Sequence, residues 1–166
     1  MAAKYYAIKS CVQSTLKPIG AENETGDIPI NFVNTFSQTR ESDSLAARAD
    51  GVEVITLETN VKYTFSVSME VITEPVLAML MGAEYNAETN TMTAKGEAPT
   101  TVYSLEGIFT LVGDDGSRLV KKMNIGKCRP IANNTVDLSS IDLSTFELQF
   151  NMLIDNNEFF KIVNNA

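Results

Sequence analysis

Hydrophobic and polar side chains alternate over the stretch 61–71. The apolar members of this alternation are Val61, Tyr63, Phe65, Val67, Met69 and Val71. Successive side chains of a strand point to opposite faces, so a period of two predicts a long strand with one buried and one solvated face. We expect the rest of the chain to pack against this strand.

The period changes directly after this strand. Pro75 opens a compact apolar block and Gly82 closes it. Proline suits the first turn of a helix and glycine the residue after its end, so the pattern predicts a short helix over 74–81. The helix is apolar nearly all round, which predicts that Met79 and Met81 pack in the core. A methionine-rich binding groove is the alternative.

Two further stretches predict long amphipathic strands, at 101–112 and 145–154. Turns rich in Asp, Asn and Gly follow both of them, at 113–116 and 155–157. Shorter strands are predicted at 4–13, 28–33, 51–59, 117–128, 135–138 and 158–163, and a small hairpin at 83–94.

The stretch 34–50 differs from the rest, because it mixes both charges and carries only scattered apolar residues. It predicts a long loop, and loops of this length in a compact domain are usually functional or disordered. Together these elements predict a mainly β fold: an antiparallel β-sandwich or partly closed barrel flanked by one short α-helix. A chain of 166 residues is expected to form this as a single domain, 1–166.

The charge balance limits the possible partners. The net charge is −8, so we expect no grip on nucleic-acid phosphates, which depends on Lys and Arg. The N-terminal residues lack a continuous apolar segment, and no window approaches 18 apolar residues, so neither a secretory signal nor a transmembrane helix is expected. Cys11 and Cys128 are therefore expected to be reduced and buried rather than paired.

Catalytic chemistry has little support in the sequence. The chain has no His, which removes Ser-His and Cys-His nucleophiles and histidine metal sites. The turn 113–116 lacks the Lys and Ser/Thr of a phosphate loop, and the acidic turns lack the ligand spacing of a calcium loop. Paired carboxylates remain a third possibility, because spatial pairing is invisible in a sequence. We expect no enzyme activity, no catalytic residues, no metal and no cofactor.

The solvated faces of the three long strands carry the more informative pattern. Their side chains are small or neutral, with one acid per strand, and no Lys or Arg interrupts them after Lys62. An ordinary outer sheet face mixes both signs of charge. The pattern indicates either a plain outer face or a smooth, weakly acidic wall past which an anion slides. The residues of this predicted wall are Thr64, Ser66, Ser68, Glu70, Ser104, Glu106, Thr110, Glu147, Gln149 and Asn151.

The order of these elements resembles that of a known family. A long strand leads into a short apolar helix ending in Gly, followed by a long strand, an Asp-Gly turn, a basic return strand, a Leu-Ser-rich run and a final Phe-x-Leu-x-Phe strand. The stretches that carry this order are 64–86, 103–130 and 136–162. In these features the chain resembles the major tail tube proteins of long-tailed, non-contractile bacteriophages.

The resemblance implies a structural role. Six copies would form a ring with their sheets joined edge to edge, and rings would stack into a hollow virion tail through which DNA passes without specific binding. Other tail proteins would cap the tube, no membrane would be involved, and the subunit would be made in the host cytoplasm. The predicted loop 34–50 would contact a neighbouring subunit or ring. Its candidate contact residues are Phe36, Arg40, Glu41, Asp43, Leu45 and Arg48.

One expectation concerns the direction in which the predicted wall faces, and another the alternative function of the protein. The glutamates Glu70, Glu106 and Glu147 would line the lumen, or the same face would point outward. The alternative function is a monomeric β-sandwich binding module, such as a receptor-binding or capsid-decorating domain, which would need an exposed apolar or aromatic patch.

Overall fold

The computed structural model describes residues 6–19, 26–30, 33–97, 100–131 and 146–164. The chain is mainly β, as predicted, with one short helix. Its elements in order are β1 (Tyr6–Ile19), β2 (Ile28–Ile30), β3 (Val33–Ala49), β4 (Val52–Met69), α1 (Glu74–Leu80), β5 (Glu84–Asn86), β6 (Thr91–Thr93), β7 (Val102–Gly113), β8 (Arg118–Pro130), β9 (Phe146–Leu153) and β10 (Lys161–Asn164).

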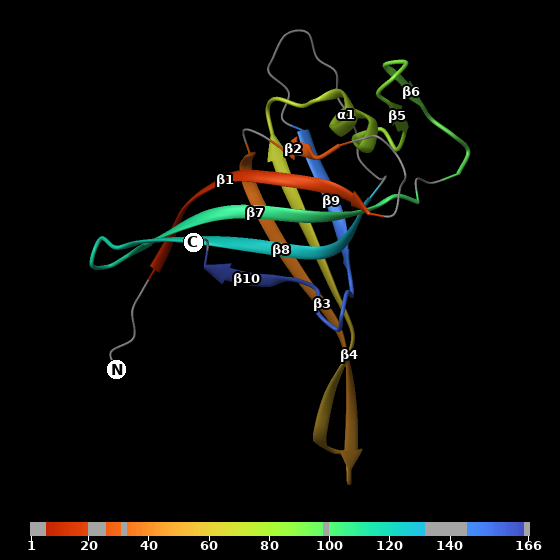
Figure 1. Cartoon of the computed structure of the whole chain (residues 1–166). Coiled ribbons are helices and arrows are strands. Elements are labelled where there is room, and N and C mark those ends of the chain that lie inside the picture. The colour runs from red at the N-terminus through yellow and green to blue at the C-terminus, as the bar shows by residue number, and fades with distance from the viewer. Residues whose placement is uncertain (1–5, 20–25, 31–32, 98–99, 132–145, 165–166) are drawn as a thin grey trace.

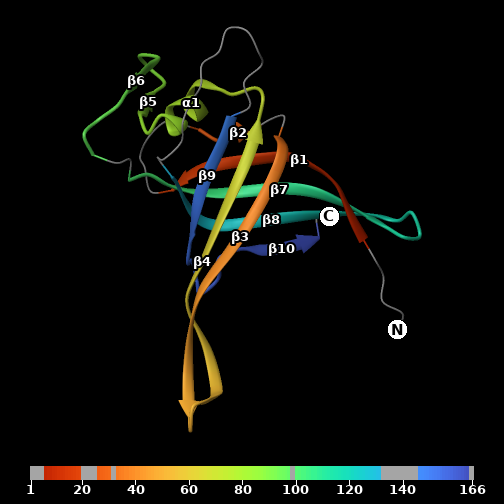
Figure 2. The same cartoon turned by 180° about the vertical axis from the view of Figure 1, so that it is seen from behind.

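In the described part of the chain, eight strands form one antiparallel sheet that does not close. The order is β2-β1-β7-β8-β9-β4-β3, and β10 pairs with β8 off this path. The sheet bends at β8, where only the last four residues, Lys127 to Pro130, pair with β9. As a result β1, β7, β8 and β10 form one layer, and β9, β4 and β3 cross it as a second layer (Figure 1). The view from behind brings this second layer to the front (Figure 2).

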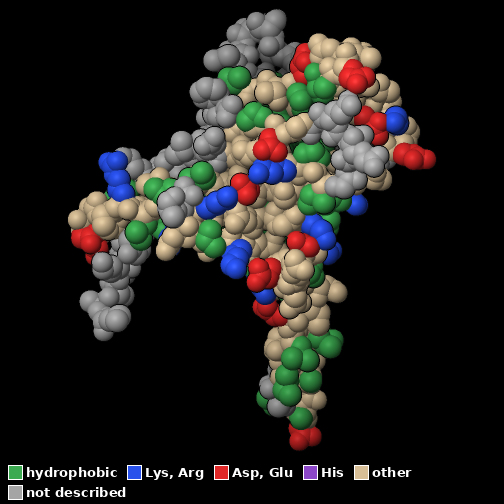
Figure 3. All heavy atoms as spheres, in the orientation of Figure 1, with side chains coloured by type: hydrophobic (Ala, Val, Ile, Leu, Met, Phe, Trp, Pro, Cys, Tyr) green, Lys and Arg blue, Asp and Glu red, His purple; other side chains and the backbone are tan. Residues whose placement is uncertain are grey.

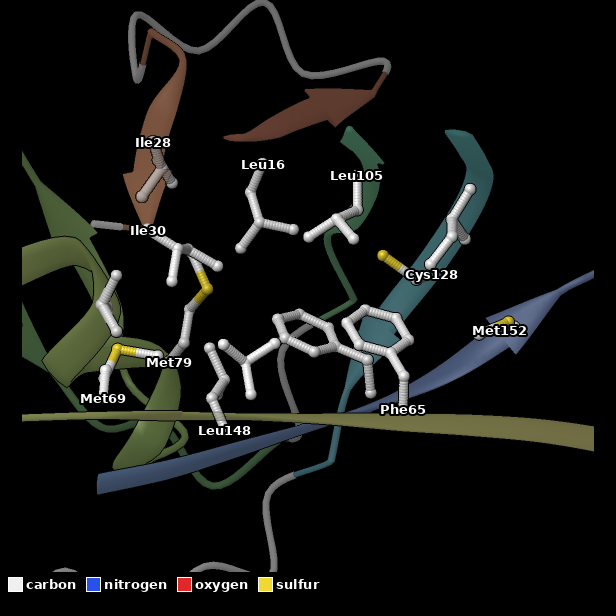
Figure 4. Close-up of a cluster of buried hydrophobic side chains, with 14 of the residues drawn as sticks. Leu16, Ile28, Ile30, Phe65, Met69, Met79, Leu105, Cys128, Leu148 and Met152 are labelled. Carbon is white, nitrogen blue, oxygen red and sulfur yellow. The ribbon is translucent and has the colours of Figure 1, made fainter. Parts of the chain in front are cut away.

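The core lies between the two layers. The predicted strand 61–71 supplies Phe65, Val67 and Met69, each at most 2% exposed. Phe65 stacks on Phe150 of β9 with ring centroids 4.7 Å apart. Leu105 of β7 belongs to the same cluster of buried side chains and joins it from the first layer (Figure 4). Burying side chains of this size is the main stabilising term of the fold, at about 1.5–3 kcal/mol each.

Helix α1 covers one end of the core, together with the small β5–β6 hairpin (Figure 1). Pro75 occupies its first turn, and Gly82 follows the cap residue with φ +64°. The prediction for the methionines holds in part. Met79 is 6% exposed and packs in the core, whereas Met81, the C-cap residue just past Leu80, is 56% exposed.

The predicted loop 34–50 is wrong: these residues form strand β3. It pairs with β4 along nearly its whole length, from Val33 opposite Met69 to Ala49 opposite Val52. Asp50 and Gly51 connect the two strands with positive φ angles of 51° and 79°. An Asp-Gly pair accepts this conformation, which suits a two-residue hairpin turn. The strand character of β3 therefore comes from its long partner and the turn, since its own sequence has no apolar alternation.

The remaining elements largely follow the prediction. The 83–94 hairpin, the turns 113–116 and 155–157 and the long strands β7 and β9 are present. The first strand runs further than 4–13, because Leu16 is fully buried and β2 pairs beside it. The predicted strand 135–138 and the side chain of Cys11 lie outside the described residues. Cys128 is a free, buried thiol, as expected, and burial raises its pKa to about 12.

Candidate assembly surfaces

The predicted wall divides between two faces of the molecule. Six of its residues lie on β4 and β9, where Thr64 stands opposite Asn151, Ser66 opposite Gln149 and Ser68 opposite Glu147. Residues directly opposite each other on paired strands share a face of the sheet. These six therefore form one continuous surface on the outside of the second layer.

Strand β3 extends this surface by a third column, which the sequence did not predict. Thr35, Ser37 and Thr39 stand opposite the β4 residues of the surface. The hydroxyls of Ser37 and Ser66 lie 2.6 Å apart, within hydrogen-bonding distance. We call this three-strand surface the polar face. It consists of Thr35, Ser37, Thr39, Thr64, Ser66, Ser68, Glu147, Gln149 and Asn151.

The other predicted residues do not join the polar face. Ser104, Glu106 and Thr110 belong to β7, and they point away from its buried Leu105. They therefore lie on the outside of the first layer, which is the layer in front in Figure 1. Glu70 is exposed just beyond the end of β4.

The outer face of the first layer is not an acidic wall. Glu106 lies 3.0 Å from Lys122 of β8 and 3.9 Å from Lys17 of β1. Basic and acidic side chains alternate over these strands (Figure 3). The prediction considered each strand by itself and therefore missed the cations that neighbouring strands contribute. Of the three glutamates proposed for the lumen, only Glu147 lies on the polar face.

The β3–β4 hairpin projects well beyond the core (Figure 1). We call the projecting part, from Asp43 to Thr59, the arm. Exposed polar contacts stabilise its base: the Asn60 amide donates to the Asp43 carboxylate at 2.9 Å, and Arg40 forms an ion pair with Glu58. This pairing lowers the pKa of Glu58, through the hydrogen bond from Arg40 and the attraction between the two charges.

The six predicted contact residues of this segment occupy different environments. Phe36 is half-buried, and its ring stacks on Phe65 at 5.6 Å, so it belongs to the core edge and not to an exposed loop. Glu41 stands opposite Lys62 on β4. Arg40 lies in the ion pair at the base, while Leu45 and Arg48 are exposed along the arm.

The arm carries apolar residues that the sequence analysis did not assign to a surface. Leu45, Val52, Ile55 and Leu57 are 63%, 66%, 53% and 56% exposed. In Figure 3 hydrophobic side chains cover much of one side of the arm. The Asp50-Gly51 pair was the available signal, because it places the flanking segments in one hairpin and brings these residues together.

Strand β3 is an edge of the sheet. Among the described residues no strand pairs with its outer side. At the other edge, β2 covers only Ser14 to Leu16 of β1. Open edges of this length are pairing sites for further strands, and soluble proteins generally cover or charge them.

An aromatic hollow of about 340 Å³ lies near the base of the arm. Its lining residues are Tyr63, Glu158, Phe159, Phe160 and Lys161. The Tyr63 ring contacts those of Phe159 and Phe160, with centroids 4.9 and 5.6 Å apart. Within the described part of the chain, no cluster of three or more acidic or cysteine side chains could hold a metal ion. The same part contains no helix with the length and apolar character needed to span a membrane.

No family model and no curated protein matches the sequence. Among solved structures, the chain is similar to one in the baseplate of the anti-feeding prophage, determined by cryo-electron microscopy with six-fold symmetry. The two chains are 11% identical, the match covers 95% of each, and the TM-score is 0.48. We therefore base the function on the surfaces of this chain itself.

Proposed function

We propose that this protein is a non-enzymatic structural subunit of a bacteriophage tail, which assembles into stacked, hexameric rings that enclose a channel for DNA. The single observation that carries the proposal is the β3–β4 hairpin. It combines an open sheet edge with an arm whose exposed apolar residues pack on no other part of the described chain. Such a surface is costly to leave in water, and copies of the same chain can cover it.

The open edges also supply a way to build a ring. Pairing the β3 edge of one copy with the open part of β1 in the next would continue the sheet from subunit to subunit. A head-to-tail contact of this kind closes into a ring when its rotation allows, and otherwise forms a filament. The hexameric number comes from the family resemblance and not from the geometry.

The polar face is the best candidate for the channel wall. It presents hydroxyl and amide groups, with Glu147 as its one charge, and Gln149 donates to that carboxylate at 3.2 Å. Short neutral side chains offer no cation to DNA phosphates, and a ring of Glu147 would repel them within a Debye length of about 8 Å. The first layer carries Lys17 and Lys122 and is better suited to the outside.

Electron microscopy and DNA ejection test this function together. Purified protein at high concentration should form rings or tubes. In assembled tails, the double variant Ser66→Lys/Gln149→Lys should slow DNA ejection, because it places cations on the polar face. The matched control is Ser104→Lys/Thr110→Lys on the opposite layer, which should leave ejection unchanged.

Two results would contradict the proposal. Ejection that slows only in the control would place the other layer inward. Monodisperse monomers under all conditions would favour the alternative, a monomeric binding module. The aromatic hollow around Tyr63 and Phe159 is the observation that favours this alternative, because it offers a partly exposed aromatic surface to a ligand.

A further inference from the structure

The exposed apolar residues of the arm lie on one face. Leu45 stands directly opposite Leu57, and Ala47 opposite Ile55. A one-residue bulge follows, after which Ala49 stands opposite Val52. The other face carries Ser44, Ala46, Arg48, Thr56 and Glu58. The arm therefore has one apolar face and one more polar face, but its apolar face does not cover a hydrophobic core. We call its apolar side the arm patch: Leu45, Ala47, Ala49, Val52, Ile55 and Leu57.

A second apolar surface lies on the first layer, where it extends beyond the crossing strands. On β8, Leu119 stands opposite Leu111 of β7, and Met123 stands opposite Ile162 of β10. Met123 belongs to the core, so these residues continue the core-facing side of the sheet. Leu119 and Ile162 are nevertheless 36% and 46% exposed. We call this surface the β8 patch: Leu111, Leu119, Lys121 and Ile162.

Charges of opposite sign border the two patches. Asp43 lies at the base of the arm patch and Asp50 at its tip, whereas Arg48 and Glu58 belong to the other face of the arm, where Glu58 forms an ion pair with Arg40. The β8 patch contains Lys121, and Arg118 and Lys161 flank it, while Asp114 and Asp115 lie in the turn beyond it. Opposite charges around matching apolar centres favour one orientation of two surfaces and disfavour contact between two copies of the same patch.

The two patches of one chain lie on different projections. The arm and the β7–β8 hairpin project in different directions from the body (Figures 1 and 2). The arm extends about 25 Å, at 3.3 Å per strand residue, whereas a compact chain of this length has a radius of gyration of about 15 Å. It is therefore long enough to cross a substantial part of a neighbouring molecule.

We propose that the arm patch of one copy docks on the β8 patch of a second copy, with the acidic arm beside Lys121. The contact is head-to-tail, because each copy offers one surface of each kind. The inference deepens the proposed function and rests on it, since it names the surface that receives the arm during assembly.

Cross-linking between two different variants tests this docking. The variants Leu45→Cys and Ile162→Cys are made in a Cys11→Ser background, mixed during assembly and treated with a short bismaleimide. Cys128 should not react, because its thiol is buried and its pKa is raised to about 12. A cross-linked dimer is expected in the mixture and not with either variant alone. The matched control is Ala46→Cys, on the opposite face of the arm, which should give no dimer with Ile162→Cys.

The outcomes separate the docking from the proposed function. Rings or tubes that form without the Leu45–Ile162 cross-link would overturn the docking and leave the tube function standing. A specific cross-link without rings or tubes would support the docking and contradict the tube. Equal cross-linking of Leu45→Cys and Ala46→Cys would overturn the docking, because it would show that neither face of the arm is selected. The absence of both cross-link and assembly would overturn both.

Discussion

Phe36 and Leu45 lie on the same strand but in different surroundings. The Phe36 ring stacks on Phe65 at the edge of the core, whereas Leu45 is 63% exposed on the arm. They are nine positions apart, an odd number, so their side chains point to opposite sides of the strand. Leu45 also belongs to the arm, which has no core beneath it.

Substituting these two residues should give very different losses of stability. Phe36→Ala removes a half-buried ring and its aromatic contact, and should lower the free energy of unfolding by about 2 kcal/mol. Leu45→Ala should change the stability of the monomer by less than about 0.5 kcal/mol, since the side chain is already in water. Urea unfolding of both variants at a concentration where the protein is monomeric measures the difference. Equal losses would mean that the arm packs on the body in solution.

At the level of the element, the arm is a hairpin whose stability depends on its turn and its ladder. Its apolar residues face solvent, so burial contributes little to it. The left-handed conformations of Asp50 and Gly51 close the two strands in the register that forms the arm patch. A structure of this kind is expected to open locally without unfolding of the core.

The substitution Gly51→Val should loosen the arm alone. A β-branched residue at φ +79° is strained by about 1–3 kcal/mol, and the strain acts at the tip of the hairpin. Hydrogen exchange should become faster in peptides from 43–59 and stay unchanged in those from 63–69. The control Gly96→Val lies at an exposed position with space for a side chain and should leave both unchanged. Faster exchange throughout the chain would show that the arm and core unfold as one unit.

The whole molecule consists of a body from which the arm and the β7–β8 hairpin project (Figures 1 and 3). Among the described residues, the hydrophobic core lies in the body, and none of its members lies between Asp43 and Thr59. The net charge of the chain, −8, adds a general repulsion between separate copies, which keeps them soluble until specific surfaces meet. Folding and assembly should therefore depend on different parts of the chain.

Removing the arm should separate these two properties. A variant in which Asn-Gly replaces residues 43–59 should fold with a thermal midpoint close to that of the full chain, and should remain monomeric. Small-angle scattering should give a radius of gyration near the compact value of about 15 Å, below that of the full chain. Analytical ultracentrifugation and electron microscopy measure the assembly. Rings formed by the shortened chain would show that the arm is dispensable.

Much of the fold follows from local patterns. The alternation at 61–71 and in the two other long strands predicted their existence and most of their buried faces, and Pro75 and Gly82 predicted the ends of the helix. The prediction for Val71 was wrong, because β4 ends at Met69 and leaves Val71 60% exposed. The segment 34–50 was wrong because its strand character comes from pairing with β4, which periodicity does not record. The candidate surface was predicted in part: the pattern identified solvated positions correctly but could not assign them to layers.

The sequence by itself determined which side chains share a face of each long strand and where the turns fall, because apolar period two and turn chemistry are local properties of the chain. Only the tertiary structure decided where the solvated faces point. The bend of the sheet at β8 sends the polar sides of β4 and β7 to opposite surfaces. The pairing of β1 and β8 with β7 places Lys17 and Lys122 beside Glu106. Strands β3 and β4 continue past the core, so the end of their hairpin projects and exposes its apolar side. These outcomes depend on contacts between distant segments, and no single strand contains the information for them.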